Sequence, residues 1–207
     1  MTVAGGRLRC FVALTLDPAS RDALAALPVA AGARRTRRDQ LHVTIAFLGA
    51  IERVKSEQLG ARLAGLAAVE AVPPVDVERV VCWPSTAHAR LVVAELAPQQ
   101  QLLALGERVA GALAELGLPP DSRAFKPHVT IARFPRDAHR VTIDGANGAN
   151  GANGANGANG ANGANGANGA AGREPLALRF ETLTLYESVL ARTGAEHRVL
   201  AAAALPE

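Results

Sequence analysis

The pentapeptide HVTIA occurs twice in this chain, once in "LHVTIAFLG" at residues 41–49 and once in "PHVTIARFP" at residues 127–135. Val, Thr and Ile are typical strand residues, so each copy predicts a β-strand. In a strand, residues i and i+2 point to the same face. The histidine and threonine of each copy therefore share one face, while valine and isoleucine face the core. The repeat predicts two similar strands that each present an imidazole beside a hydroxyl.

The remaining chain alternates apolar patterns of period two with patterns of helical spacing. Asp17 followed by Pro18 is a typical helix start, and Gly117 a typical helix end. The first motif strand is expected to stop at Gly49. Strands are expected at 7–16, 73–83, 89–96, 139–143, 176–188 and 196–205, besides the two motif strands, and helices at 17–27, 52–69 and 98–117.

Paired strands with helices outside them indicate an α+β fold rather than a doubly wound parallel sheet. The repeated pentapeptide suggests two similar lobes, and 207 residues fit one domain or two small lobes that share a core. Residues 145–168 are eight copies of Gly-Ala-Asn, followed by Gly-Ala-Ala-Gly. Such a tract has no side chains to bury, so 145–172 is expected to be a flexible low-complexity insertion.

Composition narrows the class of protein. Cys10 and Cys82 lie in apolar strand patterns and are expected to be buried free thiols, with no zinc-binding spacing. The chain has no run of 18 apolar residues and no apolar leader at its start, which favours a soluble cytoplasmic protein without membrane contact. A net charge of +3 is compatible with a phosphate-bearing ligand but does not require one.

Imidazole can give or take a proton near neutral pH, and a hydroxyl can donate a hydrogen bond to an anionic oxygen. If the two lobes are related by a pseudo-twofold axis, His42 and His128 can face one cleft. A phosphate held there would meet an acid on one side and a base on the other, as in-line displacement at phosphorus requires. Thr44 and Thr130 would hold its non-bridging oxygens. This chemistry needs no metal and no cofactor.

The two motifs, with "RCFVALTLDPASRDAL" and "LTLYESVLARTG", resemble the 2H phosphoesterase superfamily. Within it the chain is similar to the RNA 2′,3′-cyclic phosphodiesterases, formerly called 2′-5′ RNA ligases. The resemblance covers nearly the whole chain except the Gly-Ala-Asn tract. It implies a single bilobal domain over residues 1–207, with two pseudo-twofold-related lobes of antiparallel sheet and outer helices around a central cleft.

The resemblance also implies an enzyme that opens a 2′,3′-cyclic phosphate on RNA ends or nucleotides to a 2′-phosphomonoester. By motif position His42 is then the proton donor to the 3′-oxygen, and His128 is the base that activates water. Thr44, Thr130 and Arg133 bind phosphate oxygens, and Phe47 stacks on the terminal base. The last turn departs from the family pattern, since it reads "GAEHR" with His197.

Three other interpretations stay open at this point. The same site can act in reverse as a 2′-5′ RNA ligase, or the fold can bind nucleotides or RNA without turnover. HVTIA can also be a purely structural duplication of two core strands.

The arginines just before the first motif are either a guide for RNA phosphates or a solvated loop, and the histidines outside the motifs are expected to be structural or exposed. Those residues are Arg34, Arg35, Arg37 and Arg38, and His88, His139 and His197. The chain is expected to be a monomer by default.

Overall fold

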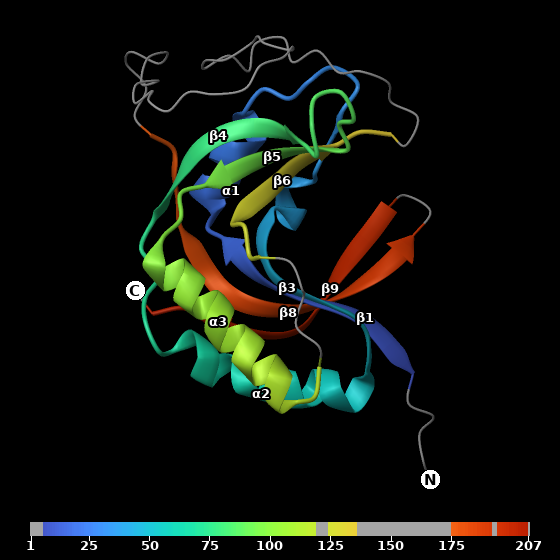
Figure 1. Cartoon of the computed structure of the whole chain (residues 1–207), viewed down its shortest axis with the longest axis vertical. Helices are drawn as coiled ribbons and strands as arrows, with labels where there is room; N and C mark the ends of the chain where they lie inside the picture. The colour runs from blue at the N-terminus through green and yellow to red at the C-terminus, as the bar shows by residue number, and fades with distance from the viewer. Residues whose placement is uncertain (1–5, 119–123, 136–174, 192–193, 207) are drawn as a thin grey trace, which may run out of the picture.

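The computed structural model describes residues 6–118, 124–135, 175–191 and 194–206. Within these ranges it contains three α-helices, a short 3₁₀ turn and nine strands (Figure 1). The helices are α1 (Pro18–Ala26), α2 (Arg53–Ala67) and α3 (Gln100–Glu115), and the 3₁₀ turn is η1 (Arg38–Gln40). The strands are β1 (Arg7–Leu16), β2 (Arg34–Arg35), β3 (His42–Glu52), β4 (Val75–Trp83), β5 (Leu91–Leu96), β6 (His128–Arg133), β7 (Ala177–Leu178), β8 (Phe180–Ala191) and β9 (Gly194–Ala204).

The strands form a nine-stranded sheet in the order β7-β4-β5-β6-β3-β1-β8-β9, with β2 paired to β6 off this path. The strand pairs are antiparallel. The chain is therefore a mixed fold of one large antiparallel sheet and few helices, which confirms the helix and sheet content expected of an α+β protein. The tract at 145–172 and the strand expected at 139–143 lie outside the described residues.

The two HVTIA strands, β3 and β6, are neighbours in the middle of the sheet, joined by the pair Val43↔Val129. Both valines are fully buried, and both occupy the second position of the pentapeptide. On one side of this junction lie β1, β8 and β9, and on the other lie β5, β4 and β7. The repeated sequence thus forms the seam between the two halves of the sheet.

Each HVTIA strand contains a β-bulge at its isoleucine. Val12 pairs with Ala46 and Ala13 with Thr44, which leaves Ile45 without a partner on β1. On the other strand, Ile131 is left over in the same way between Ala132 and Thr130, which pair with neighbouring residues of β5. An extra residue reverses the alternation of faces beyond it. The residue five positions after each histidine therefore lies on the same face as that histidine.

The prediction that the first motif strand ends at Gly49 is wrong, because β3 continues to Glu52. Gly49 has φ of 65° and pairs with Cys10, and Leu48 is left over between it and Phe47. A glycine tolerates this left-handed conformation, so the strand absorbs a second bulge instead of stopping. The basic segment before β3, expected as a loop, contains β2 and η1.

The other local signals at the helix ends are confirmed. Asp17 caps α1 by accepting a hydrogen bond from the Ser20 amide at 2.8 Å, with Pro18 at the first helical position. Gly117, with φ of 66°, follows the end of α3. Cys10 and Cys82 are buried free thiols, as expected. In the described part of the chain, no helix has the length and apolar character needed to span a membrane.

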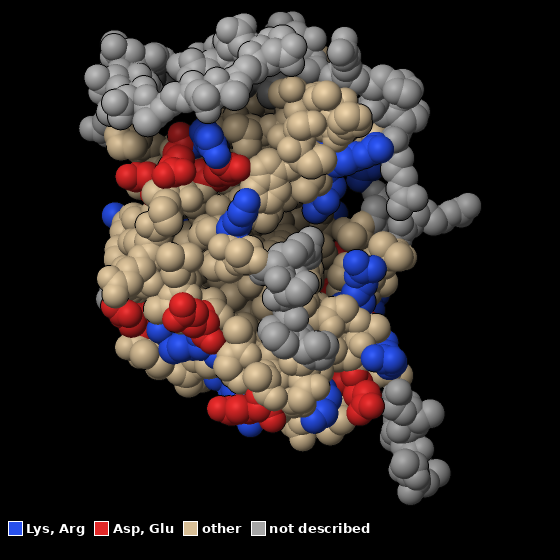
Figure 2. Space-filling model, viewed as in Figure 1, with Lys and Arg blue, Asp and Glu red and all other residues tan. Residues whose placement is uncertain are grey.

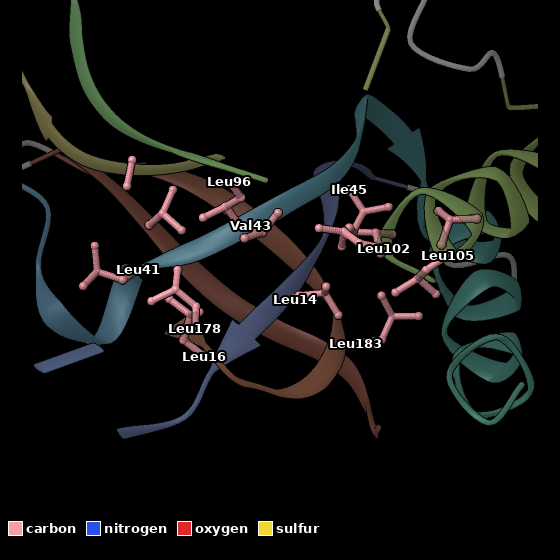
Figure 3. Close-up of a cluster of buried hydrophobic side chains, with 14 of the residues drawn as sticks. Leu14, Leu16, Leu41, Val43, Ile45, Leu96, Leu102, Leu105, Leu178 and Leu183 are labelled. Atoms are coloured by element: carbon pink, nitrogen blue, oxygen red, sulfur yellow. The ribbon is translucent and has the colours of Figure 1, made fainter. Parts of the chain in front are cut away.

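The main core lies between the sheet and α2 and α3, which pack side by side at one end of the molecule (Figure 1). Leucines from β1, β8 and α3 meet there with Ile45 of β3 (Figure 3). The spacing of α2 buries Leu59 and Leu63. With one sheet face committed to this core, the histidine and threonine of each motif project from the opposite face, where they are only partly buried.

Candidate active site

The imidazole of His42 is held from both ring nitrogens. Nδ1 lies 2.7 Å from the carbonyl oxygen of Gln40, and Nε2 lies 3.1 Å from Oγ1 of Thr44. A carbonyl oxygen only accepts hydrogen bonds, so Nδ1 carries a proton and donates it. In the neutral ring Nε2 is then bare and accepts a hydrogen bond from the Thr44 hydroxyl. This contact matches the expected pairing of His42 and Thr44 on one strand face.

Aromatic and cationic groups surround His42. The rings of Phe11 and His197 have centroids 5.1 Å and 5.3 Å from that of His42. Burial lowers the pKa of His42 to about 4, against the hydrogen bond to the Gln40 carbonyl, which raises it. This value also includes the positive charges of His197, Arg133 and His128, which add to the lowering by burial. The free protein therefore holds His42 neutral at pH 7, with Nε2 ready to accept a proton.

His128 is anchored in the same way but has different neighbours. Its Nδ1 lies 2.7 Å from the carbonyl oxygen of Lys126, which fixes the same tautomer and leaves Nε2 bare in the neutral ring. Burial lowers the pKa of His128, while the hydrogen bond to Lys126 and the negative charge of Glu95 raise it. The indole ring of Trp83 lies against this imidazole, with centroids 4.4 Å apart.

The junction of the two strands brings the two histidine–threonine pairs together. Counting outward from Val43↔Val129 in an antiparallel pair places His42 nearest Thr130 and His128 nearest Thr44. The influence of His128 on the pKa of His42 agrees with this proximity. A purely structural duplication predicts histidines in separate environments, and this arrangement argues against it.

Phe47 and Arg133 occupy equivalent positions after the two bulges. Phe47 is 52% exposed, and its ring lies 6.2 Å from that of Phe11, which also contacts His42. The charge of Arg133 acts on His42, His128 and His197 alike. Arg133 therefore places a cation, and Phe47 an exposed aromatic ring, beside the paired histidines. Their roles in base stacking and phosphate binding stay predictions.

His197 is a site residue that the sequence reasoning missed, since it was expected to be structural or exposed. It lies on β9, and its ring is T-shaped to those of both His42 and Phe11, with its centroid 4.8 Å from that of Phe11. Phe11 in turn stacks on Tyr186 of β8, at 5.1 Å between centroids. The signal was present in the last turn, where His197 stands at a departure from the family pattern.

Most of the arginines before β3 form hydrogen bonds or ion pairs with other residues of the chain. Arg35 donates to the carbonyl oxygens of Ala25 and Leu27 after α1, at 3.0 and 2.8 Å. Arg37 pairs with Asp39 at 2.6 Å, and Arg38 pairs with Asp22. Arg34 differs, because β2 pairs it directly with Arg133. These contacts favour the interpretation of a structural segment for Arg35, Arg37 and Arg38.

A pocket of about 400 Å³ adjoins His42 on the side of η1 and β8. His197, Tyr186, Thr15 and Thr182 are among its lining residues. A hollow of about 490 Å³ between α2 and α3 lies on the helical side instead and contains none of the motif residues. Figure 2 shows Lys and Arg side chains around the hollowed middle of one face, with most Asp and Glu side chains toward its left and lower edges. This distribution suits an anionic ligand.

Among the residues that the structure describes, no group of three or more His, Cys, Asp or Glu side chains is arranged to hold a metal ion. The functional groups gathered around the junction of β3 and β6 are three imidazoles, two hydroxyls, a guanidinium and several aromatic rings. Such a set can transfer protons and bind a phosphate group.

Comparison with known proteins places this fold and site in a class. The sequence model of the 2′-5′ RNA ligase superfamily matches residues 16–147. The chain therefore belongs to the 2′-5′ RNA ligase superfamily, a family of 2H phosphoesterases. The match includes both HVTIA strands.

Solved structures share the same fold. TT0787 of Thermus thermophilus is 23% identical, with a TM-score of 0.66 over 96% of this chain and 98% of that one. LigT of E. coli complexed with 3′-AMP is 22% identical, with a TM-score of 0.64 over 97% and 99%. LigT complexed with NADP+ is also 22% identical, with a TM-score of 0.66 over 97% and 99%. At these identities the likeness concerns the fold.

Proposed function

We propose that this protein is an RNA 2′,3′-cyclic phosphodiesterase. It hydrolyses the 2′,3′-cyclic phosphate of RNA ends or nucleotides to a 2′-phosphomonoester, without a metal or other cofactor. The observation that carries the proposal is the pairing of the two HVTIA strands at equivalent valines, Val43 and Val129. In the proposed bilobal domain a pseudo-twofold axis runs through this pair, so that two imidazole–hydroxyl units flank one phosphate.

In the proposed reaction a water oxygen attacks phosphorus in line with the bond to the 3′-oxygen. Nε2 of His128 takes a proton from this water as the new P–O bond forms. The bond from phosphorus to the 3′-oxygen breaks, and Nε2 of His42 gives its proton to that oxygen. The products are a 3′-hydroxyl and a 2′-phosphomonoester. General acid–base catalysis of this kind contributes roughly 10²–10⁴-fold.

The free protein is prepared for only half of this reaction, because its acid must first gain a proton. Both rings hold their Nδ1 proton on a backbone carbonyl, and the pKa of His42 is lowered to about 4. An anionic phosphodiester bound beside His42 favours the imidazolium form and raises this pKa. We therefore propose that the negative charge of the bound substrate causes Nε2 of His42 to take up the proton that it later donates.

The remaining site residues bind rather than transfer protons in this proposal. Thr44 and Thr130 donate hydrogen bonds to the non-bridging oxygens, on which charge accumulates during the reaction. Arg133 neutralises the phosphate, and the exposed ring of Phe47 stacks on the terminal base. The structures of E. coli LigT complexed with 3′-AMP and with NADP+ support a nucleotide as the kind of ligand.

The experiment is a product assay on an RNA with a 2′,3′-cyclic phosphate end, in excess chelator, with 2′- and 3′-phosphate resolved. The native protein is expected to give the 2′-phosphate, and His42→Ala and His128→Ala are expected to be inactive. Native rates in either variant would overturn the two-histidine mechanism. Tight nucleotide binding without turnover would favour a binding module instead.

Ligation is the second candidate, because the family to which the chain belongs bears the name of a 2′-5′ RNA ligase. It uses the same site with a 5′-hydroxyl in place of water: the 5′-oxygen attacks phosphorus and loses its proton to His128, the bond from phosphorus to the 3′-oxygen breaks, and that oxygen takes the proton of His42, which leaves a 2′-5′ phosphodiester. Incubation of 2′,3′-cyclic and 5′-hydroxyl RNA ends, followed to equilibrium, compares joined with hydrolysed product. The proposal also takes the protein to be monomeric and cytoplasmic.

A further inference from the structure

Trp83 reaches His128 from two strands away. It lies at the end of β4, which is separated from β6 by β5 in the sheet. Its indole ring nevertheless lies against the imidazole of His128 in a tilted contact, with centroids 4.4 Å apart and an angle of 46° between the ring planes. Trp83 is partly buried. The contact therefore lies on the face of the sheet that carries the catalytic candidates.

Glu95 fixes this indole in place. Nε1 of Trp83 donates a hydrogen bond to one carboxylate oxygen of Glu95 at 2.7 Å, and the other oxygen pairs with Arg79. Glu95 is also the cross-strand partner of His128 in the ladder of β5 and β6. Burial raises the pKa of Glu95, but the hydrogen bonds from Arg79 and Trp83 and the positive charges of Arg79 and Lys126 together outweigh it and hold this pKa below its usual value. A fixed anion and a fixed aromatic ring thus meet at one imidazole.

We propose that Trp83 and Glu95 are positioning residues for His128, which orient its imidazole and stabilise the imidazolium that forms when it takes a proton. The face of an aromatic ring attracts a cation, and tryptophan does so most strongly. Glu95 adds the attraction of its negative charge. The part of this inference that rests on the proposed function is the role of His128 as the catalytic base. The contacts of Trp83 and Glu95 with His128 are present in the free protein.

The other groups near His128 act in both directions. Arg133, on the same strand, lowers the pKa of His128, whereas the backbone carbonyl of Lys126 raises it as Glu95 does. His42 faces it from β3, and each ring disfavours a proton on the other. Trp83 and Glu95 are therefore the side chains, from β4 and β5, that favour the charged form of His128.

The experiment follows His128 by NMR, through the titration of its ring protons, in the native protein and in Trp83→Leu, Trp83→Phe and Glu95→Gln. The pKa of His128 is expected to fall by roughly half a pH unit in Trp83→Leu. The fall should be smaller in Trp83→Phe, which keeps an aromatic face without the N–H group. Glu95→Gln is expected to lower the pKa as well, because it removes the negative charge.

The sign of the shift separates the proposal from simple space filling. If Trp83 only shielded His128 from water, its removal would admit solvent and raise the pKa. An unchanged or raised pKa in Trp83→Leu therefore overturns the proposal. Glu78→Gln is the matched control, since Glu78 is an exposed carboxylate of the same strand and should leave the titration unchanged. A native pattern of backbone amide signals in the NMR spectrum reports that each variant is folded.

Activity provides the second measurement. Trp83→Leu is expected to lower kcat on a 2′,3′-cyclic nucleotide roughly tenfold, through misorientation of the base, with little change in KM. Trp83→Phe should recover part of this loss. A raised KM with native kcat would instead make Trp83 a substrate contact and overturn the positioning role. The NMR shift without any hydrolysis by the native protein would overturn the proposed function alone.

Discussion

The two HVTIA strands have the same sequence, the same tautomer-fixing carbonyl and the same bulge, yet their imidazoles meet opposite environments. His42 lies among Phe11, Tyr186 and His197, with Arg133 nearby. The ring of His128 lies against the indole of Trp83, and the negative charge of Glu95 acts on it. One ring is surrounded by apolar and cationic groups, and the other has an anion beside it.

This difference shows that the proton affinity of each histidine is set by its neighbouring strands rather than by its own motif. β1, β8 and β9 supply the surroundings of His42, whereas β4 and β5 supply those of His128. A duplicated motif can thus provide two unlike catalytic groups. In the free protein the balance of charges favours a proton on His128 over His42. In the proposed mechanism His42 is the acid, so the bound phosphate must reverse this order.

The largest expected effect comes from removing either imidazole. His42→Ala and His128→Ala should each lower kcat by a factor of about 100 or more. A nucleotide p-nitrophenyl diester separates the two roles, because nitrophenolate leaves without a proton. On this substrate His42→Ala should recover most of the native rate, and His128→Ala should not. Recovery by His128→Ala instead would show that the acid and base are exchanged.

The stability of the protein should depend on pH through His42. Its pKa in the folded state, about 4, lies below the usual value of 6.5 in the unfolded chain, so the unfolded state binds more protons between these values. The contribution of neutral, buried His42 to the free energy of unfolding is complete above pH 6.5 and is lost as the pH falls toward 4. Between pH 7 and 4 the native protein should lose roughly 2–3 kcal/mol more of its free energy of unfolding than His42→Phe does.

Urea unfolding at several pH values measures this difference, with fluorescence of Trp83 as the signal. His128→Phe provides the comparison, since Glu95 favours the charged form of His128 and opposes the effect of burial. Its acid sensitivity should differ less from that of the native protein. Equal behaviour of the two variants would mean that the environments of the histidines do not differ as the structure indicates.

Local patterns were enough to predict most of the secondary structure. The apolar run of β1, the cap at Asp17 and the leucine spacing of α2 depend on residues close in sequence, and each is found where expected. The histidine and threonine of each motif also share a face as predicted, because successive side chains of a strand alternate between its two faces.

Such local patterns could not predict contacts between strands that are far apart in the sequence. Phe47 lies five residues after His42, an odd spacing that puts the two on opposite faces of a regular strand. The bulge at Ile45 brings them to one face, and it exists only in the register with β1. The meeting of His197 with His42 likewise depends on the packing of β9 and β8 beside β1. Only the resemblance to a family suggested Phe47, and nothing singled out His197 as a contact.

Removal of one hydroxyl at a time tests whether the two halves hold the phosphate equally. Thr44→Val and Thr130→Val keep the branched shape and remove the donor, and each should lower kcat/KM roughly ten- to a hundredfold. Thr44→Val should show the added loss of the hydrogen bond to Nε2 of His42. Thr86→Val, at an exposed loop position, is the control. Native activity in both motif variants would remove the threonines from the mechanism.

The smallest effects are expected at the two positions beyond the bulges, where the copies of the motif differ in sequence. Phe47→Leu keeps an apolar side chain but removes the stacking surface, so KM for a purine 2′,3′-cyclic phosphate should rise about fivefold. Arg133→Gln should raise KM for every cyclic phosphate, because it removes a charge rather than a base contact. A bare ribose 2′,3′-cyclic phosphate, which has no base, separates them: it should be affected by Arg133→Gln and not by Phe47→Leu. If both variants lose activity on it equally, Phe47 acts through Phe11 and the packing around His42, and the division between base and phosphate recognition fails.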